Sequence, residues 1–216
     1  MNSLIIVGAG GFAREVAWLV ERINTRTPTW KILGFLDDDP TIQQMKINNY
    51  PVLGTVDCAS NYPEVNFICA IGSSRTREKV VSKIKSMMPD VRFATLIDPT
   101  VELSDYVSIG EGTIICAHSI ITVNIKIGVH AIINLDCTVG HDAELGDYVT
   151  LYPSVNVSGI TAIGRCTELG TGMQIIQGKC VGEYSIIGAG AVVVKDIPSY
   201  CTAVGSPAKP IKFFDV

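Results

Sequence analysis

An aliphatic residue recurs at every sixth position from Ile97 to Val193, and this period constrains the fold more than any other feature of the chain. All 17 positions of the series carry Ile, Leu or Val, and glycine directly follows in eight of them. A small or β-branched residue commonly stands four positions later. One large and one small inward side chain per hexad, with tight corners, predicts a solenoid of three short strands per turn. The unbroken phase predicts nearly six coils of three hexads each, and their exposed apolar faces predict a closed oligomer.

The first part of the chain has a different pattern. Short β-rich runs at 3–8, 32–36 and 66–71 alternate with segments of helical periodicity at 11–23 and 75–87. This alternation predicts a small, mostly parallel α/β unit. We therefore expect two domains, over residues 1–95 and 96–216.

Composition narrows the functional classes. The chain has 17 Lys+Arg against 21 Asp+Glu, so it lacks the basic excess that a nucleic-acid partner would require. It has no apolar run of the length that crosses a bilayer, and the N-terminus begins directly with a strand-like segment, so we expect neither a membrane span nor a secretion signal. Seven cysteines without a CxxC motif are typical of a reducing, cytoplasmic location.

Several strings along the chain resemble the hexapeptide-repeat acyltransferases, and within them the sugar O/N-acetyltransferases of the sialic-acid and bacillosamine pathways. In order, they are GAGGFAREV, GFLDDD, CAIGSS, IIN, VGHDAELGDYV, VSG, IGAGAVV and VGSPAK. The resemblance implies a Rossmann-like N-terminal domain that holds a nucleotide sugar, followed by a left-handed parallel β-helix. It also implies a homotrimer that binds acetyl-CoA between adjacent β-helices.

Acetyl transfer requires a base, and three histidines could supply it. Only His141 has an acidic neighbour, Asp142, within the string GHDAELGD, whereas His118 and His130 are expected on the surface. The resemblance implies that His141 is the general base and that Asp142 raises its basicity. The alternative is a solvated corner histidine. Because neighbours in a strand point to opposite sides, the pair requires a turn of the backbone.

Gly159 follows His141 by three hexads, one full coil, and should lie directly above it. The resemblance assigns its backbone N–H to the thioester carbonyl, although Gly159 could instead serve only a tight corner. By the same resemblance, Thr150, Thr171 and Ala189 contact acetyl-CoA. Thr150 departs from the family, where a histidine is common at that position.

The motif GAGGFA after the first strand is similar to a phosphate-binding turn at a helix N-terminus. The resemblance extends the substrate site to seven residues, namely Gly10, Gly11, Phe12, Asp37, Asp38, Gly54 and Asn134. The aspartates could instead form a solvated turn before Pro40, and Asn134 could cap a coil. No two of the three histidines are separated by one full coil, so no metal site is expected.

Three functions fit these features. The first is acetyl-CoA-dependent N-acetylation of a UDP-linked 4-amino sugar. The second is O-acetylation of sialic acid or another polysaccharide sugar, which the motifs do not distinguish from the first. The third is a nucleotide-binding scaffold that has lost catalysis, suggested by Thr150.

Overall fold

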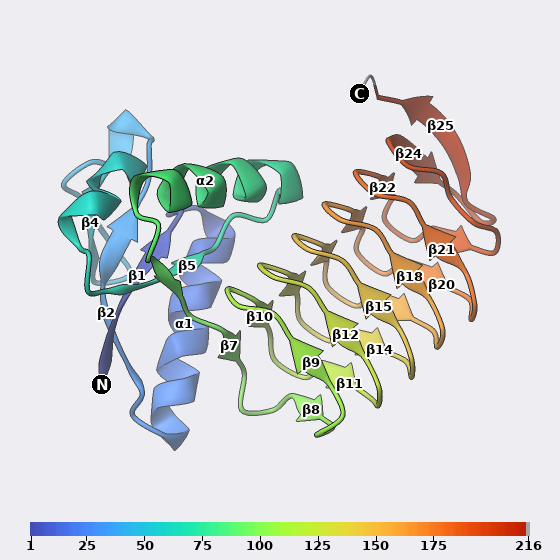
Figure 1. The fold of residues 1–216 in the computed structure, drawn as a ribbon, viewed down its shortest axis with the longest axis horizontal. Helices are drawn as coiled ribbons and strands as arrows, with labels where there is room; N and C mark the ends of the chain where they lie inside the picture. Colours follow the sequence, from blue (N-terminus) through green and yellow to red (C-terminus); the bar gives the residue numbers. More distant parts are fainter. Residues whose placement is uncertain (215–216) are drawn as a thin grey trace. The chain divides into compact units, whose positions relative to one another are not determined.

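The computed structural model of the chain describes residues 1–214 (Figure 1). Its contacts divide the chain into two units, Met1–Pro99 and Thr100 onward. The first unit contains an open sheet with two long helices, and the second is a parallel β-helix. This order confirms the predicted fold class, in which an α/β pattern precedes a six-residue repeat.

The sheet of the first unit has the strand order β3-β4-β2-β1-β5-β6. Its pairs are parallel except for β3 and β4, which are antiparallel. The strands are β1 (Asn2–Val7), β2 (Trp30–Leu36), β3 (Lys46–Ile47), β4 (Tyr50–Gly54), β5 (Asn66–Cys69) and β6 (Arg92–Phe93), with β7 (Leu96–Ile97) following. The helices are α1 (Gly11–Arg26) and α2 (Ser74–Met87), with 3₁₀ turns η1 (Pro40–Ile42) and η2 (Val56–Asn61).

The strands and the helices of this unit differ in which of their residues are buried. The four apolar residues of β1 from Leu4 to Val7 are completely buried, as expected for a parallel strand covered on both faces. Helix α1 instead buries one stripe and leaves its other side in solvent. The buried residues of α1 are Ala13, Val16, Ala17, Leu19 and Val20.

The strand order reverses beside β1. The chain leaves β1 through α1 and enters β2 on one side, whereas β5 pairs with β1 on the other side. Ligands of open α/β sheets bind at the carboxyl ends of strands where the order reverses. The loops after β1 and β5 are therefore where a binding site is expected.

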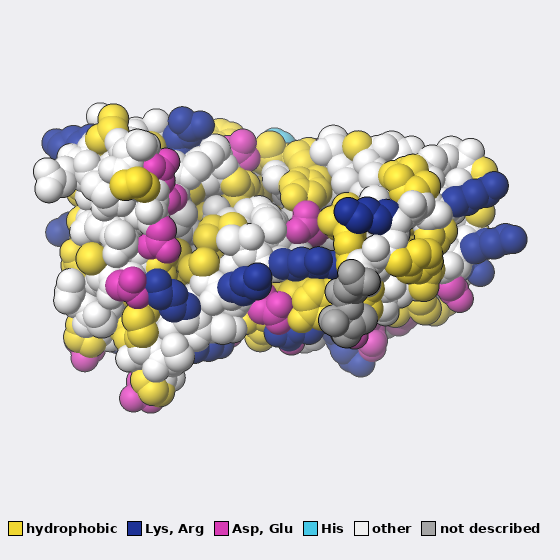
Figure 2. Space-filling model, turned by 90° about the horizontal axis from the view of Figure 1, so that it is seen from above, with side chains coloured by type: hydrophobic (Ala, Val, Ile, Leu, Met, Phe, Trp, Pro, Cys, Tyr) yellow, Lys and Arg dark blue, Asp and Glu magenta, His cyan; other side chains and the backbone are white. Residues whose placement is uncertain are grey.

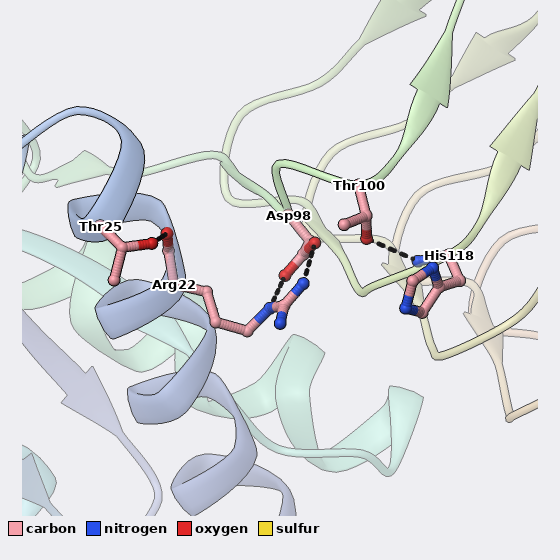
Figure 3. Close-up of polar contacts among 5 residues, drawn as sticks. All are labelled: Arg22, Thr25, Asp98, Thr100 and His118. Atoms are coloured by element: carbon pink, nitrogen blue, oxygen red, sulfur yellow. Dashed lines mark hydrogen bonds and ion pairs between the residues drawn. The ribbon is translucent and has the colours of Figure 1, made fainter.

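A buried carboxylate ties α1 to the end of this unit. Arg22 donates from Nε to Asp98 Oδ2 at 2.6 Å and from Nη2 to Oδ1 at 3.0 Å (Figure 3). The Asp98 side chain is 1% exposed and that of Arg22 is 29% exposed. Hydrogen bonding to Asp98 raises the pKa of Arg22 above its usual value, against a smaller opposing effect of burial.

We expect Arg22→Met to lower the free energy of unfolding by about 1–2 kcal/mol, because a charge-assisted hydrogen bond to a buried carboxylate is lost and Arg22 is partly exposed. Urea denaturation measures this loss. Arg26→Met, in the exposed last turn of the same helix, should change stability by less than about 0.5 kcal/mol. Equal losses in the two variants would contradict the assignment of this stabilisation to the Arg22–Asp98 pair.

From β8 to β23, the second unit consists of short strands of two residues each, joined by tight corners. Its strands are β8 (Glu102–Leu103), β9 (Ser108–Ile109), β10 (Ile114–Ile115), β11 (Ile120–Ile121), β12 (Lys126–Ile127), β13 (Ile132–Ile133), β14 (Thr138–Val139), β15 (Glu144–Leu145), β16 (Thr150–Leu151), β17 (Asn156–Val157), β18 (Ala162–Ile163), β19 (Glu168–Leu169), β20 (Gln174–Ile175), β21 (Cys180–Val181), β22 (Ile186–Ile187) and β23 (Val192–Val193). Each strand from β8 to β20 pairs in parallel with the strand three hexads further along the chain, so three sheets form the faces of a prism.

The interior of the prism follows the hexad. The aliphatic positions form buried columns, such as Ile115, Ile133 and Leu151, which pair in register. The small residues four positions later are also buried, among them Ala131 and Cys137. The chain ends in an antiparallel pair, β24 (Cys201–Val204) and β25 (Lys209–Phe213), which the six-residue period does not predict.

One expectation for the β-helix is wrong. His130 is not on the surface: it is fully buried, and its ring stacks on Tyr148, one coil above, with centroids 5.2 Å apart. Arg165 covers the Tyr148 ring at 4.8 Å. His130 has the same position in its hexad as His118, which is exposed. The side chains that stack above and below a residue, and not its position in the hexad, therefore decide whether it is buried.

Acidic and basic side chains are interspersed on the face drawn in Figure 2. None of the helices among residues 1–214 combines the length and apolar character that a membrane crossing requires. All seven cysteines are free thiols, and five of them are buried.

Candidate functional site

His141 and Asp142 lie at the corner that joins β14 to β15, which we call the His141 corner. The backbone turns sharply there, because Asp142 has a φ of 59°, in the left-handed region. This turn brings the two neighbouring side chains together, with 2.8 Å between His141 Nδ1 and Asp142 Oδ2. A neutral His141 that donates from Nδ1 to this carboxylate presents Nε2 as a proton acceptor.

Gly159 lies directly above His141, as the spacing of one coil predicts. The neighbouring Ile160 N–H donates to the His141 carbonyl at 2.8 Å. A Cβ on Gly159 would lie 2.6 Å from His141 Nε2 and 2.7 Å from Cε1, so the imidazole ring packs on this glycine. Within the described residues 1–214, the Gly159 N–H has no hydrogen-bond acceptor. The corner thus combines an accepting ring nitrogen with an available backbone donor.

The Asp142 carboxylate is held on both of its oxygens. His141 contacts Oδ2, and Asn124, one coil below, donates from Nδ2 to Oδ1 at 3.2 Å. These two hydrogen bonds, that of His141 first, lower the pKa of Asp142 below its usual range. Asn124 was not among the site residues predicted from the sequence. The signal was available, because Asn124 precedes Asp142 by three hexads, the length of one coil.

The other candidates of the second unit lie away from this corner within one chain. Thr171 and Ala189 are exposed on successive coils at the corners that follow β19 and β22, and Asn134 lies at the corresponding corner after β13, one hexad position earlier. A strand of the β14–β17 sheet separates that corner from the His141 corner. Asn134 is 8% exposed, and its Oδ1 accepts from the Leu135 N–H at 2.8 Å. Thr150, on β16 in another sheet, is buried.

A cavity of about 430 Å³ lies at the switch point of the first unit. Its walls come from the loops after β1, β2 and β5 and from the start of α2. Gly10, Gly11, Phe12, Asp37 and Asp38 all line it, together with Gly8, Leu36, Val56, Ala70, Ile71, Gly72, Thr76 and Val80. Five of the seven predicted substrate residues are therefore brought together, whereas the turn after β5 and the residues of α2 were not predicted.

The start of α1 opens onto this cavity without a side-chain cap. Its N-cap residue is Gly10, and its first turn carries no acidic residue. A Cβ at Gly10 or Gly72 would meet no protein atom within 4 Å. The free backbone N–H groups and the positive end of the helix dipole favour an anion there, and the absent side chains leave it room.

The paired aspartates also organise the loops around the cavity. Asp37 Oδ2 accepts from the Ala9 N–H at 2.7 Å, and Asp38 Oδ1 accepts from the Val56 N–H at 2.8 Å. Gly54 does not line the cavity, and its carbonyl accepts from the Asp37 N–H at 3.0 Å. A Cβ at Gly54 would lie 2.6 Å from Cys58 Sγ, so close packing against Cys58 accounts for a glycine at this position.

Metal ligands do not cluster in the described part of the chain. Among residues 1–214, no group of three or more His, Cys, Asp or Glu side chains is placed to hold an ion.

Comparison with known proteins finds relatives over nearly the whole chain. The PglD N-terminal domain family matches residues 3–84, the part that contains the cavity. GDP-perosamine N-acetyltransferase from Escherichia coli O157:H7 is 33% identical over 221 residues, which cover 98% of this chain and 97% of the relative.

Two solved structures share the complete architecture. A histidine-to-asparagine variant of perosamine N-acetyltransferase from Caulobacter crescentus, in complex with CoA and GDP-perosamine, is 30% identical with a TM-score of 0.90 and covers 98% of both chains. The acetyltransferase domain of PglB from Neisseria gonorrhoeae, in complex with acetyl coenzyme A, is 33% identical with a TM-score of 0.88, covering 97% of this chain and 99% of that one.

Proposed function

Since this chain belongs to the hexapeptide-repeat sugar acetyltransferases, which are acetyl-CoA-dependent enzymes, we propose that it N-acetylates an amino sugar linked to a nucleoside diphosphate. The observation that carries the proposal is the His141 corner, where a carboxylate-held imidazole packs on a glycine with an available N–H. The relatives that act on GDP-perosamine support an amine acceptor.

In the proposed reaction, His141 Nε2 accepts the proton that the sugar amine loses as its nitrogen attacks the thioester carbon. Asp142 holds the imidazole through Nδ1 and stabilises the imidazolium that forms. The Gly159 N–H donates to the carbonyl oxygen while it carries negative charge, an interaction typically worth about 3 kcal/mol in the transition state. The C–S bond then breaks, and the thiolate of CoA takes up a proton as the acetamide is released.

The cavity of the first unit is the proposed nucleotide site. The uncapped start of α1 favours a diphosphate, and 430 Å³ is within the usual range for small-molecule sites. Two nucleobases are proposed for this site. The sequence resemblance to bacillosamine-pathway enzymes supports uracil, and the relatives named for GDP-perosamine support guanine.

We also propose a homotrimer in the cytoplasm. Thr171 and Ala189 are exposed but lie away from His141 within one chain, so an acetyl-CoA molecule that contacts both of them and His141 requires a corner from a second copy. Thr150 is buried and does not enter this argument. A cytoplasmic location agrees with the seven free thiols and with a supply of acetyl-CoA. Light scattering after gel filtration tests the trimer, and a monomeric mass would contradict it.

The activity is tested by thiol release from acetyl-CoA with a panel of UDP-, GDP- and dTDP-linked amino sugars, and with free sialic acid as a hydroxyl acceptor. Release with an amino-sugar nucleotide, and an amide in the product by mass spectrometry, is the expected result. Release with sialic acid alone would replace N-acetylation by O-acetylation. Turnover with none of these acceptors would contradict the proposed substrate class.

We expect Gly10→Val to raise the KM for the nucleotide sugar about tenfold while leaving the KM for acetyl-CoA unchanged. The new side chain meets no protein atom and occupies space in the cavity, and a loss of about 1.4 kcal/mol of binding is tenfold. Gly10 has a φ of −72°, which valine also adopts, so the fold should persist. Unchanged binding of the nucleoside diphosphate by calorimetry would place the nucleotide elsewhere.

A further inference from the structure

The coil below the His141 corner contributes a side chain that no part of the proposed mechanism uses. Asn124 has a φ of 56°, Asp142 has 59° and Ile160 has 56°, so successive coils turn in the same left-handed conformation. Residues one coil apart therefore stack, and Asn124 Nδ2 donates to Asp142 Oδ1 at 3.2 Å. We propose that Asn124 is a positioning residue of the acetyl transfer, which orients the Asp142 carboxylate so that its other oxygen holds His141.

The geometry explains why such a residue is needed. The Asp142 side chain is 50% exposed and that of His141 is 48% exposed, so water competes for both carboxylate oxygens. An exposed aspartate has several rotamers, and only some place Oδ2 at 2.8 Å from His141 Nδ1. With Asn124 bound to Oδ1, the carboxylate is held from two sides. The lowered pKa of Asp142, to which Asn124 contributes, agrees with this arrangement.

Few other charges surround the pair. The coil above provides Gly159 and Ile160, and the coil below provides Val123 besides Asn124, none of which titrates. The strands that leave the corner carry Lys126 and Glu144, which pair with each other at 2.7 Å. Asn124 is therefore the polar group through which the coil below acts on Asp142, and the proposal rests on His141 being the base.

Two substitutions separate positioning from stability. Asparagine and glycine tolerate a positive φ, so Asn124→Gly removes the donor with little backbone strain, whereas alanine would add strain. Asn124→Asp keeps the shape and places a carboxylate against Asp142. Asn49 is a matched control, because it has a φ of 70° and lies exposed in the turn between β3 and β4 of the first unit, outside the proposed sites. Asn49→Gly and Asn49→Asp make the same substitutions in the other unit.

The first experiment is a double-mutant cycle on kcat, with acetyl-CoA and the amino-sugar nucleotide that gives turnover in the panel. We expect Asn124→Gly to lower kcat about three- to tenfold with an unchanged KM for acetyl-CoA, and Asn49→Gly to have no effect. In an Asp142→Ala background, Asn124→Gly should have no further effect, because coupled residues are non-additive. Full additivity, or wild-type activity of Asn124→Gly, would overturn the proposal.

A second experiment needs no acceptor. The chain has three histidines, so the imidazole signals of ¹⁵N-histidine-labelled protein can be assigned with His141→Ala. Asn124→Asp should move the titration of the His141 ring to higher pH, because added negative charge favours the imidazolium, and Asn49→Asp should leave it unchanged. No displacement in Asn124→Asp would overturn the proposal.

Variants of His141, Asp142 and Asn124 distinguish an error in the proposed general base from an error in the role of Asn124. If His141→Ala and Asp142→Ala retain full turnover, His141 is not the general base, and the proposed role of Asn124 is refuted as well. If those variants lose activity but Asn124→Gly does not, the base stands and only the role of Asn124 is refuted.

Discussion

Replacement of His141 by alanine is expected to lower kcat by about 10² to 10⁴, the usual contribution of a general base. The KM for acetyl-CoA and the oligomeric state should stay the same, because the side chain is 48% exposed and lies at a corner, not in the aliphatic interior. Thiol release at saturating acetyl-CoA measures the loss, and gel filtration with light scattering measures assembly.

The matched control is His118→Ala. His118 is also an exposed corner histidine, but its backbone N–H bonds Thr100 Oγ1 at 3.1 Å and it has no acidic neighbour in sequence (Figure 3). Its replacement should leave kcat unchanged. Equal activities of the His141 and His118 variants would remove His141 from the mechanism and return it to the class of solvated corner histidines.

The second large effect is expected for Gly159→Ala, with a loss of kcat of about 10² or more. The added methyl group would lie 2.6 Å from His141 Nε2, so the imidazole must move away from the position in which Nε2 accepts the proton. It would also crowd the N–H proposed to bind the thioester oxygen, and removal of such a donor alone costs about 10²–10³.

Gly146→Ala separates this catalytic effect from crowding of the helix. A Cβ at Gly146 would lie 2.8 Å from the Arg165 backbone nitrogen, so it strains a coil in a similar way, but at a corner without a histidine. Both variants should lower the melting temperature, and only Gly159→Ala should abolish most of the turnover of the protein that remains folded. Parallel losses of activity and stability in the two variants would show that Gly159 has only a packing role.

The predicted architecture was confirmed because it depends on local periodicity. The six-residue series from Ile97 to Val193 specifies which side chains enter the prism, and each hexad forms the same short strand and corner. In the first unit, the helical spacing of Val16, Leu19 and Val20 predicted α1. Such patterns repeat within a few residues, so they can be recognised in the sequence without knowledge of distant contacts.

Stacking between coils follows from the period only in part. The spacing of one coil placed Gly159 over His141, and the same arithmetic would have found Asn124 below Asp142. It could not predict the burial of His130, because that depends on the large Tyr148 ring above it and on Arg165, which covers that ring. Equivalent positions of a repeat differ when their neighbours in the column differ.

By itself, the sequence determined the two architectures, their order, the inward residues of each coil, and the choice of His141, Asp142 and Gly159 as a group. Only the tertiary structure decided that Asp142 turns back to His141, because this requires a left-handed φ at a non-glycine residue. It also decided that Asp37 and Asp38 bond loop amides and that the turn after β5 completes the cavity. The physical reason is that periodicity reports which way a side chain points, whereas a site depends on contacts between residues far apart in the chain.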